Sequence, residues 1–366
     1  DFLPRFKILA PRGAVIGGGP EFLGDNAPFL ALHPEVDLVV RGDNAQSSNG
    51  FPNSRWSYSH QREMRSTANV RRGPGAAYAF PQKLRTDLDA ISFTTQEGKQ
   101  LTWGRSIDEM FTDGIVVLHR GAIVYETYRG ALEPHLPHLA FSVTKSFIGL
   151  IAAVLAHEGK IDPNAVVTRY VPELDGTAYA DATVRQVMDM TTGVQYSENY
   201  TDRNAEVRTY GIAAGFNPQP EGYAGPDTIF DFLRTLKKQG EHGQAFAYKT
   251  CNTEVLAWIV QRVTDTPITQ LLSERIWQKI GAEEDAYLIV DRIGTPACGG
   301  GMNVALRDLA RFGEMLRLGG TINGEDIVPE EVIDDIIKGG DREHFAKAGY
   351  TTVAGWSYRN QFWVSH

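Results

Sequence analysis

The chain has 366 residues, of which 42% are hydrophobic and 22% are charged, a composition typical of a globular protein long enough for more than one packed domain. The formal net charge of −9 argues against a nucleic-acid partner, which would require a basic surface to neutralise phosphates. No run of about 18 apolar residues occurs, so we expect no membrane-spanning segment and no membrane partner.

The cysteines indicate neither a disulfide framework nor a metal site. Cys251 and Cys298 are the only two, and their spacing is not that of metal ligands. We therefore expect no metal and no other cofactor. The chain starts at Asp1 rather than methionine, which leaves export open beside the favoured cytoplasmic location. The sequence also leaves a homodimer open.

Residues 1–46 differ in character from the rest and are predicted to form an N-terminal extension. Apolar runs at 14–16 and 36–40 flank a helix-like stretch, which gives a strand–loop–helix–strand pattern. Glycines 17–19 do not fit G-x-G-x-x-G in register. The stretch weakly resembles a fragment of a cobalamin-binding domain, but that domain's cobalt-ligating histidine motif is absent. A polar stretch at 45–50 then marks the boundary of a main domain at 47–366.

Within the main domain, residues 51–110 are predicted to be a long, irregular segment. The apolar runs 115–119 and 122–128, joined by Arg120 and Gly121, predict an antiparallel hairpin. An apolar helix is expected from 142 to 156, ending at Gly159. A loop-rich insertion is expected at 194–225, further helices at 183–190, 228–238, 255–263, 267–280 and 306–318, a loop at 299–301, and a strand at 356–364.

The strongest chemical signal is the pair Ser142 and Lys145 at the start of the apolar helix. Residues three apart lie on one face of a helix, so a hydroxyl and an amine would stand side by side. Burial and the positive helix N-terminus both lower the pKa of a lysine, and a neutral amine can accept the serine proton. The same helix start supplies a backbone N–H for an oxyanion hole. The pattern predicts a serine nucleophile with a lysine base.

Longer stretches carry a resemblance to a known family. From about residue 51 onward the chain resembles the penicillin-recognising serine hydrolases, which include class C β-lactamases and DD-peptidases. Within them it most resembles the branch of 6-aminohexanoate-dimer hydrolases and related esterases. The stretches that carry the resemblance are FSVTKS at 141–146, EGKIDP at 158–163, YVPEL at 170–174, NYTD at 199–202, NTEVLAWIV at 252–260 and RDLAR at 307–311.

The resemblance implies roles for individual residues. Ser142 matches the nucleophile, Lys145 its base, and Tyr248 the tyrosine that relays a proton to the leaving group. Thr250 stands where class C enzymes have asparagine, which argues against β-lactam recognition. Tyr200 matches a tyrosine that closes over the substrate.

Two departures from the family pattern affect the expected chemistry. Gly211 stands where the nylon-oligomer enzymes hold the substrate amine with an aspartate, which favours hydrolysis of esters, or of amides without the same cationic end, over cleavage of the nylon dimer. The family's third motif, with the second oxyanion N–H and the C-terminal strands, is expected after about Trp363, yet the sequence ends at His366. Either the sequence continues beyond His366, or the chain lacks half of the oxyanion hole.

We therefore expect an α+β fold of the β-lactamase/transpeptidase type, with an antiparallel sheet flanked by helices and a helical region beside it. The predicted function is cleavage of a small-molecule ester or linear amide through an acyl-enzyme, with Tyr200 and Thr250 contacting substrate. Two alternatives stay open: a non-catalytic ligand-binding protein of this fold, and a class C-type β-lactamase or DD-peptidase. A non-catalytic protein would have no need to retain Tyr248 together with Ser142 and Lys145.

Overall fold

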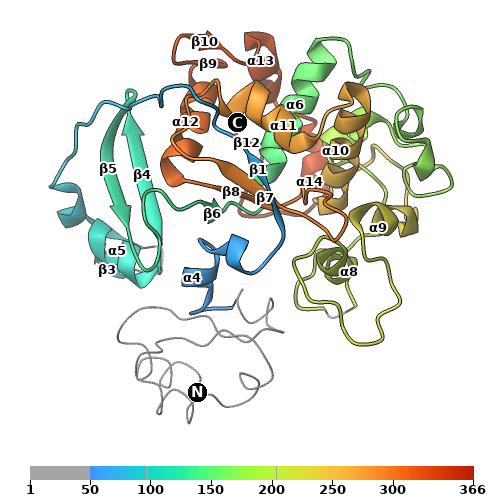
Figure 1. Cartoon of the computed structure of the whole chain (residues 1–366), viewed down its shortest axis with the longest axis horizontal. Coiled ribbons are helices and arrows are strands. Elements are labelled where there is room, and N and C mark those ends of the chain that lie inside the picture. Colours follow the sequence, from blue (N-terminus) through green and yellow to red (C-terminus); the bar gives the residue numbers. More distant parts are fainter. Residues whose placement is uncertain (1–49, 96–97, 203) are drawn as a thin grey trace.

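The computed structural model describes residues 50–95, 98–202 and 204–366. The N-terminal extension predicted at residues 1–46 lies outside these residues. In Figure 1 a β-hairpin stands on one side, a sheet with its helices lies in the middle, and a mostly helical region lies on the other side. Every pair of named strands in this part of the chain is antiparallel. The predicted fold class, antiparallel sheet with helices, is confirmed.

The helices and strands are short, apart from two helices of 15 residues each. The helices are α4 Ser54–Ser57, α5 Trp103–Glu109, α6 Val143–His157, α7 Val184–Met188, α8 Glu206–Ala213, α9 Ile229–Thr235, α10 Thr250–Thr264, α11 Ile268–Leu272, α12 Leu306–Arg317, α13 Glu330–Lys338 and α14 Arg342–Ala346, with a π-helical turn at Ser273–Trp277. The strands are β1 Thr67–Val70, β2 Ser92–Thr94, β3 Gln100–Thr102, β4 Gly114–His119, β5 Ala122–Tyr128, β6 His138–Leu139, β7 Ala286–Ile289, β8 Met302–Val304, β9 Thr321–Ile322, β10 Glu325–Asp326, β11 Ser357–Arg359 and β12 Phe362–Val364.

The central sheet has the strand order β1-β7-β8-β6. The β7 strand is buried along its whole length because it lies between two partners. The β1 strand belongs to the segment 51–110 that was predicted to be irregular, and α4, β2, β3 and α5 also lie in that segment, so the prediction was wrong for these elements. Only four residues pair in β1, and so short a polar–apolar alternation is too brief to identify a strand in a sequence.

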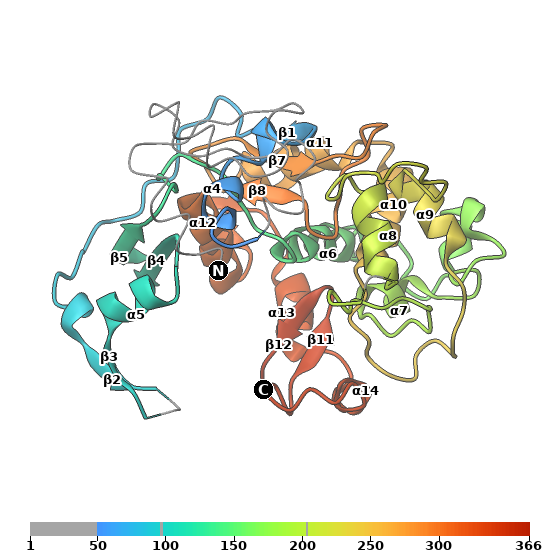
Figure 2. The ribbon, with the colours of Figure 1, turned by 90° about the horizontal axis from the view of Figure 1, so that it is seen from below.

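The predicted hairpin is confirmed as β4 and β5, which pair from Gly114↔Tyr128 to His119↔Ala122. Figure 2 shows it at one edge of the molecule, away from the helical region that contains α7 to α10. The loop-rich segment at 194–225 contains one helix, α8, which the prediction missed. The remaining predicted helices are present with ends moved by a few residues, and α11 continues into the π-helical turn.

The single strand predicted at 356–364 is wrong, because the segment is a hairpin of β11 and β12. Asn360 and Gln361 both have left-handed backbones, with φ of 49° and 67°, so the chain reverses there. Two successive left-handed residues are the requirement of a tight type I′ hairpin turn. The Gln361 amide donates to the Val187 and Met188 carbonyls and accepts a bond from Thr253. The turn therefore ties α7 to α10.

Helix α6 is the buried centre of the fold, as its apolar sequence predicted. Phe147 stacks on Phe312 of α12 with ring centroids 3.9 Å apart, and it also meets Trp277. Gly159 follows the helix with a φ of 72°, the predicted left-handed cap. No helix in the described residues is long and apolar enough to cross a membrane.

Gly149 brings α6 against the β11–β12 turn, and it predicts an effect on stability. A Cβ at Gly149 would lie 2.1 Å from the Asn360 carbonyl oxygen. We therefore expect Gly149→Ala to lower the free energy of unfolding by about 1–3 kcal/mol through overpacking. Gly313 in α12 is the matched control, since a Cβ there has nothing within 4 Å and should stabilise the helix by about 0.5–1 kcal/mol. Denaturant unfolding of both variants would contradict this prediction if Gly149→Ala were as stable as Gly313→Ala.

Candidate active site

The chain reaches Ser142 from the edge strand of the central sheet. β6 pairs with β8, and the Ala140 N–H then donates to the Met302 carbonyl at 2.8 Å. Phe141 next turns into the left-handed region, with a φ of 44°. Such a backbone is unfavourable for a side-chain-bearing residue and is held by its surroundings. The turn places Ser142 at the N-cap of α6, with its side chain exposed at the surface.

The first turn of α6 is fixed to β8 through Thr144. The Thr144 hydroxyl donates to the Phe141 carbonyl at 2.6 Å and accepts a bond from the Met302 N–H at 3.1 Å. Within the described residues, the Ser142 N–H has no hydrogen-bond acceptor. It therefore remains available, at a positive helix N-terminus, to a developing oxyanion.

The structure brings Ser142 and Lys145 together, as their spacing predicted. Lys145 Nζ donates to Ser142 Oγ at 3.1 Å and to the Gly299 carbonyl, which belongs to the loop before β8. Lys145 is 1% exposed, whereas Ser142 is open to solvent. A buried amine thus points at an accessible hydroxyl.

Burial controls the protonation of Lys145. Loss of solvent lowers its pKa to about 8, while the nearby Glu198, Glu254 and Cys251 act in the opposite direction. A lysine with this pKa has a substantial neutral fraction in mildly basic solution, and the neutral amine is the form that accepts a proton. Lys145 can therefore serve as the base for Ser142 without a histidine.

Tyr248 forms the third side of the site. Its ring centroid lies 5.1 Å from Lys145 Nζ, and Trp363 of β12 packs against it at 5.5 Å. Burial raises the pKa of Tyr248 far above neutrality, and hydrogen bonding with Ser142 lowers that pKa only in part. Tyr248 is thus a proton donor at neutral pH, whereas Lys145 can be a proton acceptor. The different environments separate the acid role from the base role.

Tyr200 and Thr250 both lie beside Glu198, a residue the sequence did not single out. The Thr250 N–H, at the start of α10, donates to one oxygen of the Glu198 carboxylate. The Tyr200 hydroxyl lies 3.5 Å from the other oxygen. Tyr200 is 61% exposed, whereas Thr250 is buried. Of the two residues expected to contact substrate, Tyr200 is therefore the more accessible.

Gly211 lies in α8, in a place that leaves no room for a side chain. A Cβ there would lie 2.2 Å from Nδ2 of Asn217. An aspartate at this position would have to displace Asn217.

Comparison with known proteins shows the family to which this chain belongs. The profile of the beta-lactamase family matches residues 107–366. The chain belongs to the beta-lactamase family. The resemblance drawn from the sequence is confirmed, and the fold is of the β-lactamase/transpeptidase type.

Relatives within the beta-lactamase family include 6-aminohexanoate-dimer hydrolase of Paenarthrobacter ureafaciens. It is 36% identical over 315 residues, which cover 86% of this chain and 78% of that protein. A solved structure from Bacillus anthracis, provisionally assigned as a 6-aminohexanoate-dimer hydrolase, has a TM-score of 0.81 and 32% identity, covering 88% of this chain and 83% of that one. The octameric penicillin-binding protein homologue of Pyrococcus abyssi shares the fold, with a TM-score of 0.53 and 18% identity over 70% of this chain and 62% of that one. The chain is a hydrolase of this family.

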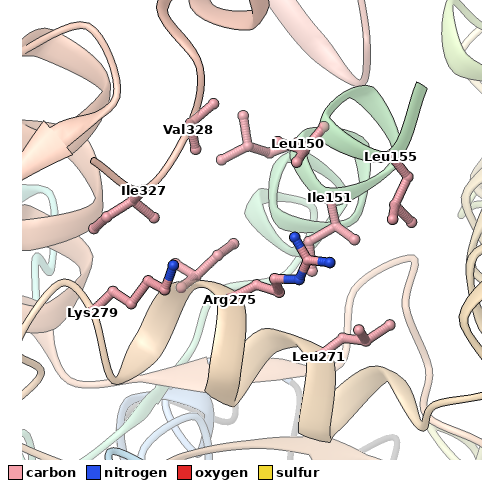
Figure 3. A pocket seen from close by; sticks show the side chains of 10 residues that line it. Leu150, Ile151, Leu155, Leu271, Arg275, Lys279, Ile327 and Val328 are labelled. Carbon is pink, nitrogen blue, oxygen red and sulfur yellow. The ribbon is translucent and has the colours of Figure 1, made fainter. Parts of the chain in front are cut away.

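An apolar pocket elsewhere on α6 is a poor candidate for the substrate site of this hydrolase. It lies between α6 and the π-helical turn, with Arg275 and Lys279 reaching across it (Figure 3). Its volume of about 30 Å³ is close to that of one water. Leu150 begins its α6 wall eight residues after Ser142, roughly 12 Å along the helix.

The described residues also contain no group of three or more His, Cys, Asp or Glu side chains that could hold a metal.

Sequence reasoning missed the carboxylate Glu254, which the structure places behind the Lys145 base. Glu254 is 3% exposed on α10 and accepts bonds from the Cys298 and Gly299 N–H groups. The available signal was a charged residue directly before the apolar run at 255–260, because a charged residue buried with such a run needs partners.

The electrostatics of Lys145 predict the pH dependence of the site. The ammonium form cannot accept a proton, so kcat/KM should rise with pH as Lys145 loses its proton. Because the pKa of Lys145 is about 8, we expect the midpoint of this rise near pH 8. The measurement is kcat/KM for an uncharged activated ester from pH 6 to 10. A profile that is flat across pH 7–9 would contradict the assignment of Lys145 as the base.

Proposed function

We propose that this chain cleaves a small-molecule ester or linear amide through an acyl-enzyme on Ser142. The observation that carries the proposal is the 3.1 Å approach of the buried Lys145 amine to the exposed Ser142 hydroxyl. The pKa of about 8 at Lys145 supports its role as the base. The relationship to 6-aminohexanoate-dimer hydrolase supports acyl transfer as the class of reaction.

Each proton in the proposed reaction has a donor and an acceptor. Ser142 Oγ attacks the carbonyl carbon while Lys145 Nζ takes the hydroxyl proton, and the Ser142 N–H stabilises the oxyanion. Tyr248 then gives its phenolic proton to the leaving oxygen or nitrogen and regains one from Lys145. Water attacks the acyl-enzyme, Lys145 accepts its proton, and that proton returns to Ser142 Oγ as the acid product leaves.

We propose that esters, or amides without a cationic end, are cleaved in preference to the 6-aminohexanoate dimer. Gly211 presents no side chain that could bind a substrate amine, and its position cannot take one without moving Asn217. We propose that the exposed Tyr200, which lies beside Glu198, contacts the substrate. Thr250 carries no carboxamide, which disfavours the class C β-lactamase and DD-peptidase alternative. We propose no cofactor and no nucleic-acid or membrane partner.

A panel of substrates tests this proposal. The purified protein should hydrolyse short-chain p-nitrophenyl esters faster than 6-aminohexanoate dimer, and nitrocefin slowest of the three. Failure to turn over any activated ester or amide would overturn the proposal in favour of a non-catalytic ligand-binding protein. Rapid turnover of nitrocefin instead would favour the β-lactamase alternative.

A further inference from the structure

Glu254 stands in the middle of a hydrogen-bond network directly behind the Lys145 amine. Its Oε1 accepts bonds from the Gly299 N–H at 2.7 Å and from the Tyr210 hydroxyl at 2.5 Å. Its Oε2 accepts a bond from the Cys298 N–H at 3.1 Å. All three donors are needed to satisfy a carboxylate in a place that water does not reach.

The Gly299 backbone connects this network to the base. Its N–H is bound by Glu254, and its carbonyl accepts a hydrogen bond from Lys145 Nζ. A fixed carbonyl takes one N–H of the neutral amine and thereby directs the nitrogen lone pair toward Ser142 Oγ. Glu254 holds the 298–299 peptide through the Gly299 N–H and thereby restrains the loop whose next peptide carries the Gly299 carbonyl.

Crowding around Gly299 shows how closely the loop is packed against α10. A Cβ at Gly299 would lie 2.2 Å from Thr250 Cγ2 and 3.0 Å from both Glu254 Oε1 and the Tyr210 hydroxyl. The backbone can approach the carboxylate this closely only because residue 299 has no side chain. The loop before β8 is thus built around Glu254.

We propose that Glu254 is a positioning residue, which aligns the Lys145 amine with Ser142 through the Gly299 backbone and stabilises the ammonium that forms when Ser142 attacks. This inference rests on the proposed serine-hydrolase function and adds a residue to it. Glu254 does not touch substrate, so its contribution is made entirely through Lys145.

The charges around the two residues agree with this role. Lys145 is faced by Glu198 from the segment before α8 and by Glu254 and Cys251 from α10. Burial raises the pKa of Glu254 to about 7. The hydrogen bonds from Tyr210, Gly299 and Cys298 and the charge of Lys145 lower this pKa, but burial has the larger effect. In mildly basic solution Glu254 is thus ionised, and its negative charge favours the protonated state of Lys145.

The variant Glu254→Gln tests the proposal on the full chain. The glutamine keeps the volume but turns an NH₂ toward one of the two backbone N–H groups, and it removes the negative charge. We expect the high-pH limit of kcat/KM for p-nitrophenyl acetate to fall tenfold or more. Because the charge of Glu254 raises the pKa of Lys145, its loss should also move the midpoint of the pH profile to lower pH. Glu314→Gln, which alters a buried carboxylate on α12 bonded by Arg317, should change neither quantity.

The outcomes separate this inference from the proposed function. If the wild-type protein neither turns over the ester nor reacts with a fluorophosphonate at Ser142, the proposed function fails. If the wild type is active and Glu254→Gln keeps its rate within twofold, or loses rate with an unmoved midpoint, the positioning role is overturned.

A second variant decides the matter if Glu254→Gln does not fold. Tyr210→Phe removes one donor from the carboxylate, which raises the pKa of Glu254 and weakens its charge opposite Lys145. The midpoint should again move to lower pH, and an unmoved midpoint would overturn the proposal.

Discussion

Ser142→Ala should lower ester turnover by about 10⁴-fold or more, because no acyl-enzyme can form without the Oγ nucleophile. The fold should be preserved. Ser142 occupies the N-cap position of α6, but its side chain makes no capping hydrogen bond. Its exposed hydroxyl also fills no core space, so the free energy of unfolding should change by less than about 1 kcal/mol. The measurement is kcat/KM for p-nitrophenyl acetate, paired with denaturant unfolding.

Ser146→Ala is the matched control for this prediction. Ser146 lies one turn further along α6, and its hydroxyl donates to the Gln361 carbonyl at 3.2 Å rather than toward Lys145. This variant should keep its turnover within about threefold of the wild type. Turnover retained by Ser142→Ala, or abolished equally in both variants, would contradict Ser142 as the nucleophile.

Lys145→Met should lower kcat/KM by about 10²–10⁴-fold, the range expected when a general base is removed. Methionine keeps an unbranched apolar stem of similar length in the same buried space. The remaining activity should lose the rise with midpoint near pH 8, because the titrating amine is gone. A variant that kept this rise would show that another group acts as the base.

The same substitution should change how stability depends on pH. The pKa of Lys145 is about 8 when the protein is folded, against 10.5 for an ordinary lysine. Between these values the unfolded chain binds more protons than the folded one, so stability rises with pH. From pH 8 to 10.5 the wild type should gain about 3 kcal/mol of unfolding free energy relative to Lys145→Met. Denaturant unfolding at the two pH values measures the difference, and equal dependence on pH would contradict the depressed pKa of Lys145.

The parts of the site that could be predicted are those encoded by local spacing. Ser142 and Lys145 lie three apart on one helix, so their meeting follows from helical geometry. Tyr248 lies far along the chain, and only the family resemblance placed it beside them. The aromatic packing that surrounds Tyr248, including Trp363 of β12, follows from a hairpin that was predicted as one strand.

The parts that could not be predicted depend on contacts between distant segments. Gly299 contributes a backbone carbonyl to Lys145. Every residue has such a carbonyl, so the sequence does not show which one binds the lysine. Glu254 binds the N–H groups of that loop across 44 and 45 residues of sequence. In the fold, β1 was missed because its four residues become a strand only when β7 pairs with them. The β1 strand therefore depends on long-range pairing, which local β propensity does not predict.

The most direct test of the account is to find where an acylating probe becomes attached. The wild-type protein would be treated with a fluorophosphonate at pH 8, digested, and mapped by mass spectrometry. We expect one adduct per chain, on the peptide that contains Ser142, and no adduct in Ser142→Ala. Labelling of a different residue, or no labelling of folded wild-type protein, would contradict the central claim that Ser142, activated by the buried Lys145, is the nucleophile.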